Sequence, residues 1–205
     1  GRLLLDPTNI TLTNTADATT AGFSAGIDNT ETFADDGTVT SNFDVRAGGS
    51  FAGVGDGTNV TLQATTDITV TDAFNLATAT GNRNVSLTLQ AGNNIAVNAA
   101  VTASGTGSLT LSADDNAPNN AGTVTIGAAG SLVTANQAIS ITAADFVLTA
   151  GGAINAGSGS VTIKPSTVTP NVNVGTAAAG FSVDNTEIGA ITSTGTITIG
   201  DRLLA

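Results

Sequence analysis

Five residue types are missing from this chain of 205 residues: cysteine, methionine, histidine, tryptophan and tyrosine. Without cysteine the chain can form neither disulfides nor thiolate metal sites. Aromatic residues make up 3% of the chain and charged residues 10%, while hydrophobic residues still make up 40%. A core is therefore available but bulky rings are rare, so we expect a narrow, regularly layered β core of small and β-branched side chains.

Basic residues are also scarce. The net charge of −11 arises because 16 acidic residues are opposed by only five basic ones: Arg2, Arg46, Arg83, Lys164 and Arg202. Nucleic acids and anionic membrane surfaces both require clustered lysine or arginine, so we expect neither as a partner. The apolar runs, such as Leu3–Leu5, are far too short to span a bilayer, and we expect no membrane insertion.

The residues that are present form short alternating segments separated by small-residue corners. Within residues 84–115, the segment 85–89 (VSLTL) alternates apolar and polar residues, which is typical of a strand with one buried face. Residues 91–94 (AGNN) favour a corner, and the alternation resumes at 95–97. Residues 105–108 (GTGS) then predict another corner before the next strand.

This pattern of strand, corner and strand recurs along the chain. Residues 62–70 (LQATTDITV) align with residues 89–97 (LQAGNNIAV) at an offset of 27, and Leu111 follows Leu89 by 22 residues. Residues 148–154 (LTAGGAI) show the same arrangement again. Periods of roughly 20 to 50 residues are typical of stacked repeat proteins.

Each repeat contains short strands and no helical periodicity, which predicts an all-β fold, a parallel β-helix with corners rich in Gly, Asn and Thr. A single coil cannot bury its own inward side chains, so each coil covers the next. We treat residues 1–205 as one domain, with regular coils over 58–205 and a less regular part over 1–57 that contains a loop excursion or a cap. At roughly 22 residues per coil the chain would make about nine turns.

Four segments carry a resemblance to a known family: RLLLDPTNIT (2–11), VTLQATTDITV (60–70), LTLQAGNNIAV (87–97) and DNTEIGAITSTGTITIGD (184–201). They resemble the repeat regions of filamentous haemagglutinin-like exoproteins, which are exported by two-partner secretion. The resemblance implies a right-handed parallel β-helix within a large, rod-like adhesin. The family's amino-terminal secretion domain is missing from the sequence, so we expect an interior or distal segment. The resemblance supplies no catalytic residues.

Carboxylates are the main candidates for chemistry. Asp35–Asp36 and Asp114–Asp115 are adjacent pairs that adjoin turn residues. Neighbouring residues of a strand point to opposite faces, so neither pair would form a catalytic dyad there. We expect solvated turn acids and no enzymatic activity.

Calcium is a second interpretation of some of these acids. Asp56 lies in residues 53–59 (GVGDGTN), which resemble one copy of the calcium-binding β-roll repeat. A β-roll needs tandem copies, and this segment occurs once. Asp35, Asp36, Asp114 and Asp115 could form loop sites with backbone carbonyls. We favour plain corners over calcium sites and expect no cofactor.

The favoured function is a non-enzymatic shaft or stalk of a large secreted or cell-surface bacterial adhesin-like protein, located outside the cell. Its partners would be neighbouring β-helix segments of the same or identical chains, and host or matrix glycans. An alternative is the subunit of a filament or matrix, assembled by head-to-tail stacking of β-helix ends. The echo of residues 1–6 (GRLLLD) in residues 200–205 (GDRLLA) motivates this alternative.

An ice-binding or carbohydrate-binding solenoid is a further alternative, because threonines recur in Thr-x-Thr pairs. These are Thr11/Thr13, Thr38/Thr40, Thr69/Thr71, Thr123/Thr125, Thr167/Thr169 and Thr196/Thr198. Their irregular spacing disfavours one flat array, and threonine is in any case a favoured outward residue of strands. The seven phenylalanines are expected to fill the core or the corners, since the Trp and Tyr platforms typical of sugar sites are absent.

Overall fold

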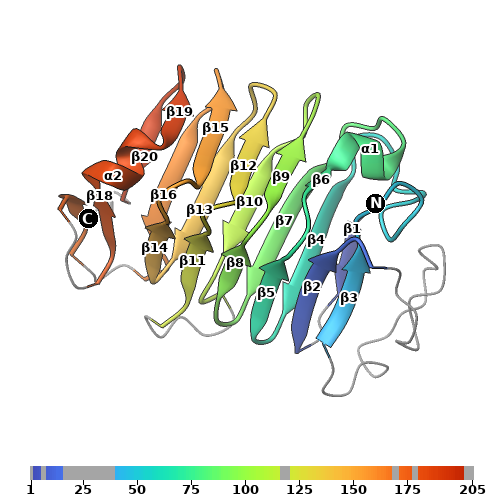
Figure 1. Cartoon of the computed structure of the whole chain (residues 1–205), viewed down its shortest axis with the longest axis horizontal. Helices are drawn as coiled ribbons and strands as arrows, with labels where there is room; N and C mark the ends of the chain where they lie inside the picture. Colours follow the sequence, from blue (N-terminus) through green and yellow to red (C-terminus); the bar gives the residue numbers. More distant parts are fainter. Residues whose placement is uncertain are drawn as a thin grey trace.

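Parallel strands make up most of the regular structure. The computed structural model of the chain describes residues 2–5, 8–15, 40–115, 121–167, 171–176 and 180–200. Strands account for 49% of the structure and helices for 6%. Every strand pairing within these ranges is parallel, and the strands lie in a long row (Figure 1). The all-β parallel fold expected from the sequence is thus confirmed.

The strands form three large sheets and one small one. Sheet A contains, in spatial order, β1 (Arg2–Leu5), β4 (Asn59–Ala64), β7 (Ser86–Ala91), β10 (Leu109–Ser112), β13 (Ile139–Ala143), β16 (Val161–Pro165) and β20 (Ile197–Ile199). Sheet B contains β14 (Asp145–Leu148), β11 (Thr123–Ile126), β8 (Ile95–Val97), β5 (Asp67–Val70), β2 (Asn9–Thr13) and β3 (Thr40–Asp44). Sheet C contains β19 (Ile191–Ser193), β15 (Ala153–Gly157), β12 (Ser131–Thr134), β9 (Ala100–Ala103) and β6 (Phe74–Asn75). Sheet D pairs β17 (Asn173–Gly175) with β18 (Ser182–Asp184).

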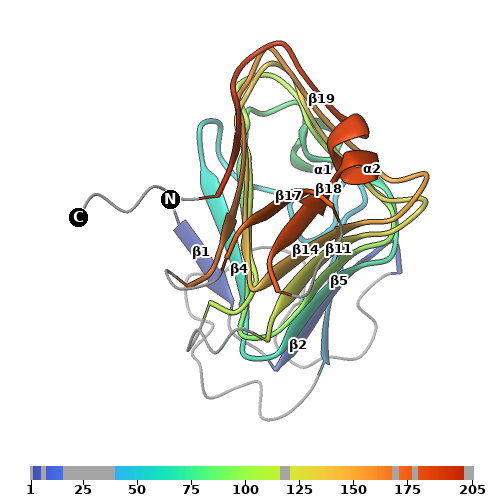
Figure 2. The same cartoon turned by 90° about the vertical axis from the view of Figure 1, so that its left-hand side faces the viewer.

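From β4 to β16, consecutive strands of the chain enter sheets A, B and C in a fixed rotation. β7 lies in sheet A, β8 in sheet B and β9 in sheet C, and β10 then returns to sheet A. We call each such passage a layer. Figure 2, turned by 90° from Figure 1, shows strands of successive layers overlying one another around a three-sided outline.

The sequence offsets of the repeats correspond to the pairing register. Leu62 lies beside Leu89 and Leu89 beside Leu111, as the offsets of 27 and 22 residues predict. The third repeated segment differs, because Leu148 ends β14 in sheet B and Ile154 lies in β15 of sheet C. Its sequence resembles the others because it also joins two alternating strands, but it forms the corner between sheets B and C.

The expectation of about nine turns is too high for the described residues, in which the longest sheet has seven strands. Layers vary in length more than the most regular repeats suggest. Leu109 pairs with Ile139, 30 residues later, and Val161 pairs with Ile197, 36 residues later. The extra residues lie in corners and excursions, which can lengthen without changing the register of the strands.

Apolar side chains stack in columns through the layers. The first inward column of sheet A consists of equivalent residues of six strands: Val60, Leu87, Leu109, Ile139, Val161 and Ile197. From Val60 to Val161 these side chains are at most 2% exposed. Removing apolar surface from water stabilises the stack by about 25 cal/mol per Å², so each layer is stabilised mainly by the layers on either side.

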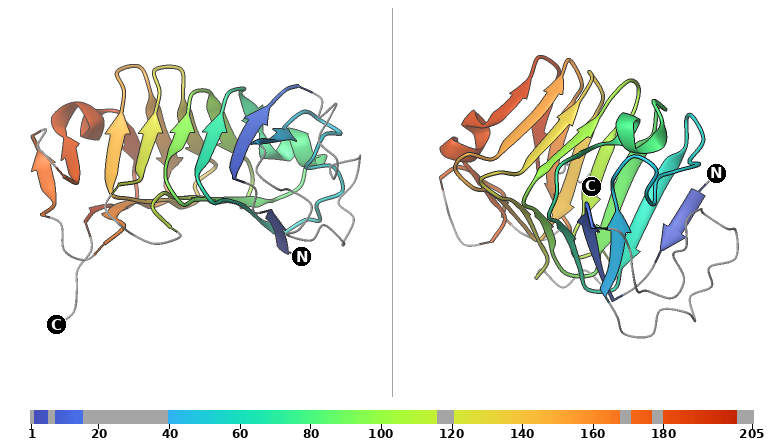
Figure 3. Two further views of the ribbon diagram at one scale, coloured as in Figure 1. Left: turned by 90° about the horizontal axis from the view of Figure 1, so that it is seen from below. Right: turned by 45° about the vertical axis from the view of Figure 1, so that its right-hand side comes forward.

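Two helices of one turn each, which the sequence did not predict, lie towards opposite ends of the stack (Figure 3). They are α1 (Leu76–Thr80) and α2 (Asn185–Gly189). Five residues are too few to show helical periodicity. Asn75 caps the start of α1 through its side chain, and Gly81 ends it with φ of 76°.

Aromatic side chains cover the core at the amino-terminal end. Phe51 lies edge-on to Phe43, with ring centroids 4.7 Å apart, and stacks on Phe74 at 5.9 Å. Phe51 is fully buried, as are Phe146 and Phe181 farther along the chain. The described phenylalanines are thus core and corner fillers, as predicted; Phe23 and Phe33 lie outside the described residues.

Because adjacent residues of β7 point to opposite faces of the sheet, we predict that substitutions at two neighbouring positions differ sharply in their effect on stability. Changing Leu89 to Ala should destabilise the protein by about 2–5 kcal/mol, because the neighbouring layers cannot close the cavity. Changing the outward Thr88 to Ala should alter stability by no more than about 0.5 kcal/mol. Urea unfolding of both variants measures the difference, and similar losses would contradict the assigned inward and outward faces.

Candidate functional site

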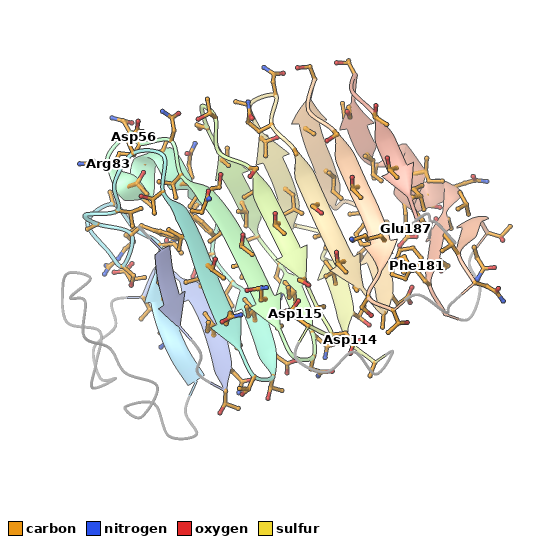
Figure 4. The ribbon with its side chains drawn as sticks, turned by 180° about the vertical axis from the view of Figure 1, so that it is seen from behind. Asp56, Arg83, Asp114, Asp115, Phe181 and Glu187 are labelled. Carbon is orange, nitrogen blue, oxygen red and sulfur yellow. The ribbon has the colours of Figure 1, made fainter. Side chains whose placement is uncertain are left out.

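The candidate acids lie at separate places on the stack (Figure 4). Asp56 lies at a corner near the amino-terminal end, whereas Asp114 and Asp115 lie together along the opposite side. Asp35 and Asp36 lie outside the described residues. Among the residues that the structure describes, no three or more His, Cys, Asp or Glu side chains are grouped so that they could hold a metal ion.

Asp114 and Asp115 are adjacent but have different surroundings. Asp114 is fully buried with φ of 61°, and its Oδ2 accepts a hydrogen bond of 2.6 Å from Ser166 Oγ. Asp115 is exposed, and its two oxygens accept from Ser112 Oγ at 2.7 Å and Gln90 Nε2 at 3.1 Å. The prediction of a solvated turn acid is therefore wrong for Asp114. Its carboxylate links a corner after β10 to the chain after β16.

Asp56 belongs to a row of hydrogen bonds along the corner that precedes sheet A. Its Oδ1 accepts from the backbone N–H of Asn84 at 2.7 Å, and from Asn84 Nδ2 at 3.1 Å. In the next layer, Asn84 Oδ1 accepts from the N–H of Thr106 at 3.1 Å. Asn136 Oδ1 accepts from the N–H of Ser158 in the same manner, at 2.9 Å. We call this row the first corner ladder.

A second corner ladder lies where the chain enters sheet B. Asn9 Oδ1 accepts from the N–H of Asp67 at 3.2 Å, and Asp67 Oδ1 accepts from the N–H of Asn94 at 2.9 Å. Asn94 Oδ1 then accepts from the N–H of Thr123 at 3.0 Å. In both ladders an Asn or Asp oxygen satisfies a backbone donor of the next layer. The shared requirement is an acceptor oxygen, which both residue types provide.

Two amides and a carboxylate line a hollow at the corner between sheets A and B. Gln63 Nε2 donates to Gln90 Oε1 at 2.8 Å, and Gln90 donates in turn to Asp115. The hollow has a volume of about 190 Å³, and Ala64, Thr65, Ala91 and Gly92 complete its lining. Amide and carboxylate groups of this kind can form hydrogen bonds with a neutral polar ligand.

Hydroxyl side chains form a continuous column on the outer face of sheet A. It consists of equivalent residues of six strands: Thr61, Thr88, Thr110, Ser140, Thr162 and Thr198. Thr198, from the pair Thr196/Thr198, belongs to this column, whereas the pairs at residues 11–13, 69–71 and 123–125 do not. Thr11 pairs with Thr69 on the adjacent strand of sheet B, and Thr71 follows the end of that strand, but Ala96 separates Thr69 from Thr125. Thr38 and Thr169 lie outside the described residues.

The side chain of Glu187 accepts a hydrogen bond from the end of β14, the last strand of sheet B. This side chain is 8% exposed, and its Oε1 accepts from the N–H of Leu148, at the end of β14, at 2.8 Å. Its Oε2 accepts from the N–H of Asp184 at 2.9 Å, while Asp184 Oδ1 accepts from the N–H of Glu187. This reciprocal capping box was missed in the sequence, although the Asp-x-x-Glu spacing marks it.

Burial raises the pKa of Glu187 above its ordinary value of 4.5, and the nearby Asp184 and Asp145 act in the same direction. The hydrogen bonds from Leu148 and Asp184 oppose this shift. Desolvation has a larger effect on the pKa than these two hydrogen bonds, so the pKa of Glu187 is raised overall. The carboxylate thus links α2 to the edge of sheet B, which is a structural role.

Comparison of the chain with protein-family models, with curated proteins and with solved structures finds no match. The resemblance to filamentous haemagglutinin-like exoproteins therefore stays a prediction. None of the helices in the described part of the chain is long and apolar enough to cross a membrane.

The second corner ladder predicts that Asp67 acts through its oxygen and not through its charge. Asp67→Asn should change stability by no more than about 0.5 kcal/mol, since asparagine already occupies the equivalent position in Asn94. Asp67→Ala should cost about 1–3 kcal/mol, because the N–H of Asn94 loses its acceptor. Urea unfolding measures both. Equal losses in the two variants would show that the charge matters.

The raised pKa of Glu187 predicts how the stability of the protein depends on pH. Because its pKa is raised on folding, the folded protein retains a proton at a pH where the unfolded chain has released it. The resulting stabilisation is fully present below the ordinary value of 4.5 and is lost as the pH rises through the folded value. The free energy of unfolding of the wild type, minus that of Glu187→Gln, should therefore fall as the pH rises above the ordinary value of 4.5 and through the folded value. A constant difference would refute this assignment.

Proposed function

We propose that the chain is a right-handed parallel β-helix that serves as a non-enzymatic shaft segment of a large secreted or cell-surface bacterial adhesin-like protein. The observation that supports this best is the unbroken apolar core. Inward columns such as Val60, Leu87 and Leu109 pass from layer to layer without a polar interruption. A stack of this kind resists bending because every layer packs on its neighbours over its full width.

The acids support a structural role as well. Asp56 and Asp67 accept backbone N–H groups of the following layer, and Asp114 accepts the hydroxyl of a distant corner. Cleavage of polysaccharides by carboxylates typically uses a pair of them that flanks one glycosidic bond. These carboxylates instead lie at different corners and hold the chain itself, so we assign them to the scaffold.

The proposed setting and partners follow from the resemblance and from the surface. A shaft of the haemagglutinin-like type would work outside the cell, beside further β-helix segments. The hydroxyl column of sheet A, apart from the buried Thr61, and the hollow at Gln63, Gln90 and Asp115 offer hydrogen-bonding groups to host or matrix glycans. Such contacts would be made along the side of the shaft.

Assembly through the ends of the stack is a second candidate. One observation favours it: Ile197, which occupies the first inward column of sheet A, is 38% exposed. Apolar side chains at an open sheet end are typical of surfaces that associate.

A shaft must hold its layers at a fixed separation, and spin labels can test this. The chain has no cysteine, so Thr11→Cys and Val147→Cys provide unique labelling sites on the outer face of sheet B. These residues lie four strand spacings apart, which corresponds to about 19 Å between backbones. Pulsed electron paramagnetic resonance should give one narrow distance distribution that is independent of salt. A broad or salt-dependent distribution would overturn the proposed function.

A further inference from the structure

The hollow beside sheet A is built by three successive layers. Gln63 lies in β4 and Gln90 in β7, where the two residues pair directly across the strands. Asp115 follows β10, the sheet A strand of the next layer, and completes the row. Figure 4 shows Asp115 part-way along the stack, away from both ends. The hollow is therefore a feature of the side of the stack, and it exists because the layers pack in register.

The carboxylate of Asp115 fixes the orientation of both amides. An ionised carboxylate accepts hydrogen bonds and donates none, so Gln90 directs its Nε2 towards Asp115, at 3.1 Å. Gln90 Oε1 then faces Gln63 and accepts from its Nε2 at 2.8 Å. Gln63 Oε1 is consequently left as an acceptor without a donor among the described residues. The row thus has an acceptor at each of its ends.

The hollow also offers donors. Each amide nitrogen uses one N–H within the row and retains a second. The oxygens of Asp115 each accept one hydrogen bond, from Ser112 and from Gln90, and can accept another. The hydroxyl of the exposed Thr65 adds a group that both donates and accepts. A ligand with several hydroxyls matches this mixture, whereas the amine of a lysine side chain would use the acceptors alone.

Charge favours a cationic ligand over an anionic one. Asp115 is exposed, and no basic residue lines the hollow. Lys164 lies in the same outward column as Gln90 but three strand spacings away, which is about 14 Å and exceeds the Debye length of about 8 Å at physiological salt. The net charge of −11 acts in the same direction at longer range. A divalent metal ion is a poorer occupant, because the lining contains a single acid.

The size of the hollow limits the ligand to one ring. Its volume of about 190 Å³ is below the roughly 300–1,000 Å³ of ordinary ligand pockets. Thr88 lies two residues before Gln90 on the same outer face, and the hydroxyl column continues from it through Thr110 and Thr162. Within the described part of the chain, these three hydroxyls make no hydrogen bond to another protein group. Further units of a polymer held in the hollow would therefore meet available hydroxyl groups.

We propose that the hollow binds an amino sugar whose amine is protonated, as one unit of an amine-bearing matrix polysaccharide. The ammonium group lies against the carboxylate of Asp115, and the ring hydroxyls bond the amides of Gln63 and Gln90. This inference rests on the proposed function, which includes glycans among the partners of the shaft, and it specifies their class and their place on the stack.

The methyl glycoside of glucosamine is a direct probe, because its amine is protonated at about pH 6. Binding of a single sugar should be weak, with a Kd on the order of 1 mM, so NMR titration of the ¹⁵N-labelled chain is the appropriate measurement. The side-chain amide signals of Gln63 and Gln90 should shift. The N-acetylated counterpart carries no charge and should bind about fivefold more weakly.

Two variants that lose the same charge separate the site from the rest of the surface. Asp115→Asn keeps an acceptor for Ser112, should weaken binding of the glucosamine probe about fivefold, and should remove its advantage over the N-acetylated probe. Asp56→Asn is the matched control, since asparagine already occupies the equivalent place in the first corner ladder at Asn84, and it should bind as the wild type does. Gln63→Met has a similar length without the amide and should weaken binding of both probes.

Four outcomes would overturn the amino-sugar site. These are an absence of shifts with the glucosamine probe, equal effects of the two Asp→Asn variants, tighter binding of the N-acetylated probe, and equally tight binding of lysine amide, which would assign the hollow to amines of proteins. None of them bears on the rigidity of the stack. Narrow spin-label distances without sugar binding would refute this site alone, and broad distances with sugar binding would refute the shaft alone.

Discussion

Parallel pairing in register is the constraint on which the rest of the structure depends. Each layer of the chain is only one strand thick in each sheet, so it has no core of its own. When Leu62 lies beside Leu89, and Leu89 beside Leu111, the inward side chains stack on equivalent side chains and exclude water. A slip of one residue would turn the same leucines to the solvent. The register therefore explains why apolar positions recur strictly while the lengths between them vary.

The corners must satisfy a second condition, because backbone groups that leave a strand lose their ladder partners. Asn and Asp side chains meet this condition in both corner ladders, where their oxygens accept N–H groups of the next layer. This use accounts for acidic residues such as Asp56 and Asp67, and within the described residues no three acids are grouped as a metal site would require. In the sequence, the segment around Asp56 resembles part of a calcium-binding loop. Beside Asn84 it is one member of a row of acceptors.

The edge strands at the two ends of the stack differ in what covers them. At the amino-terminal end, Phe51 and α1 cover the core. At the carboxyl-terminal end, Glu187 occupies the edge of sheet B through a buried carboxylate. At the edge of sheet A, β20 pairs with β16 alone within the described residues, and Ile197 is 38% exposed there. A stack of parallel layers thus has uniform sides and two ends at which different groups lie over the strands.

The alternation and the offsets between repeats in the sequence predict the strands, their parallel arrangement and much of their register. These features are local or periodic: the alternation over residues 85–89 marks an inward face, and the offset from Leu62 to Leu89 marks a layer. Only the tertiary structure decided which corner each segment forms, that Asp114 is buried while Asp115 is exposed, and that Glu187 reaches Leu148. The physical reason is distance along the chain. Burial and hydrogen bonds of a corner residue depend on neighbouring layers 22 or more residues away, and no local pattern specifies which residue of those layers will lie beside it.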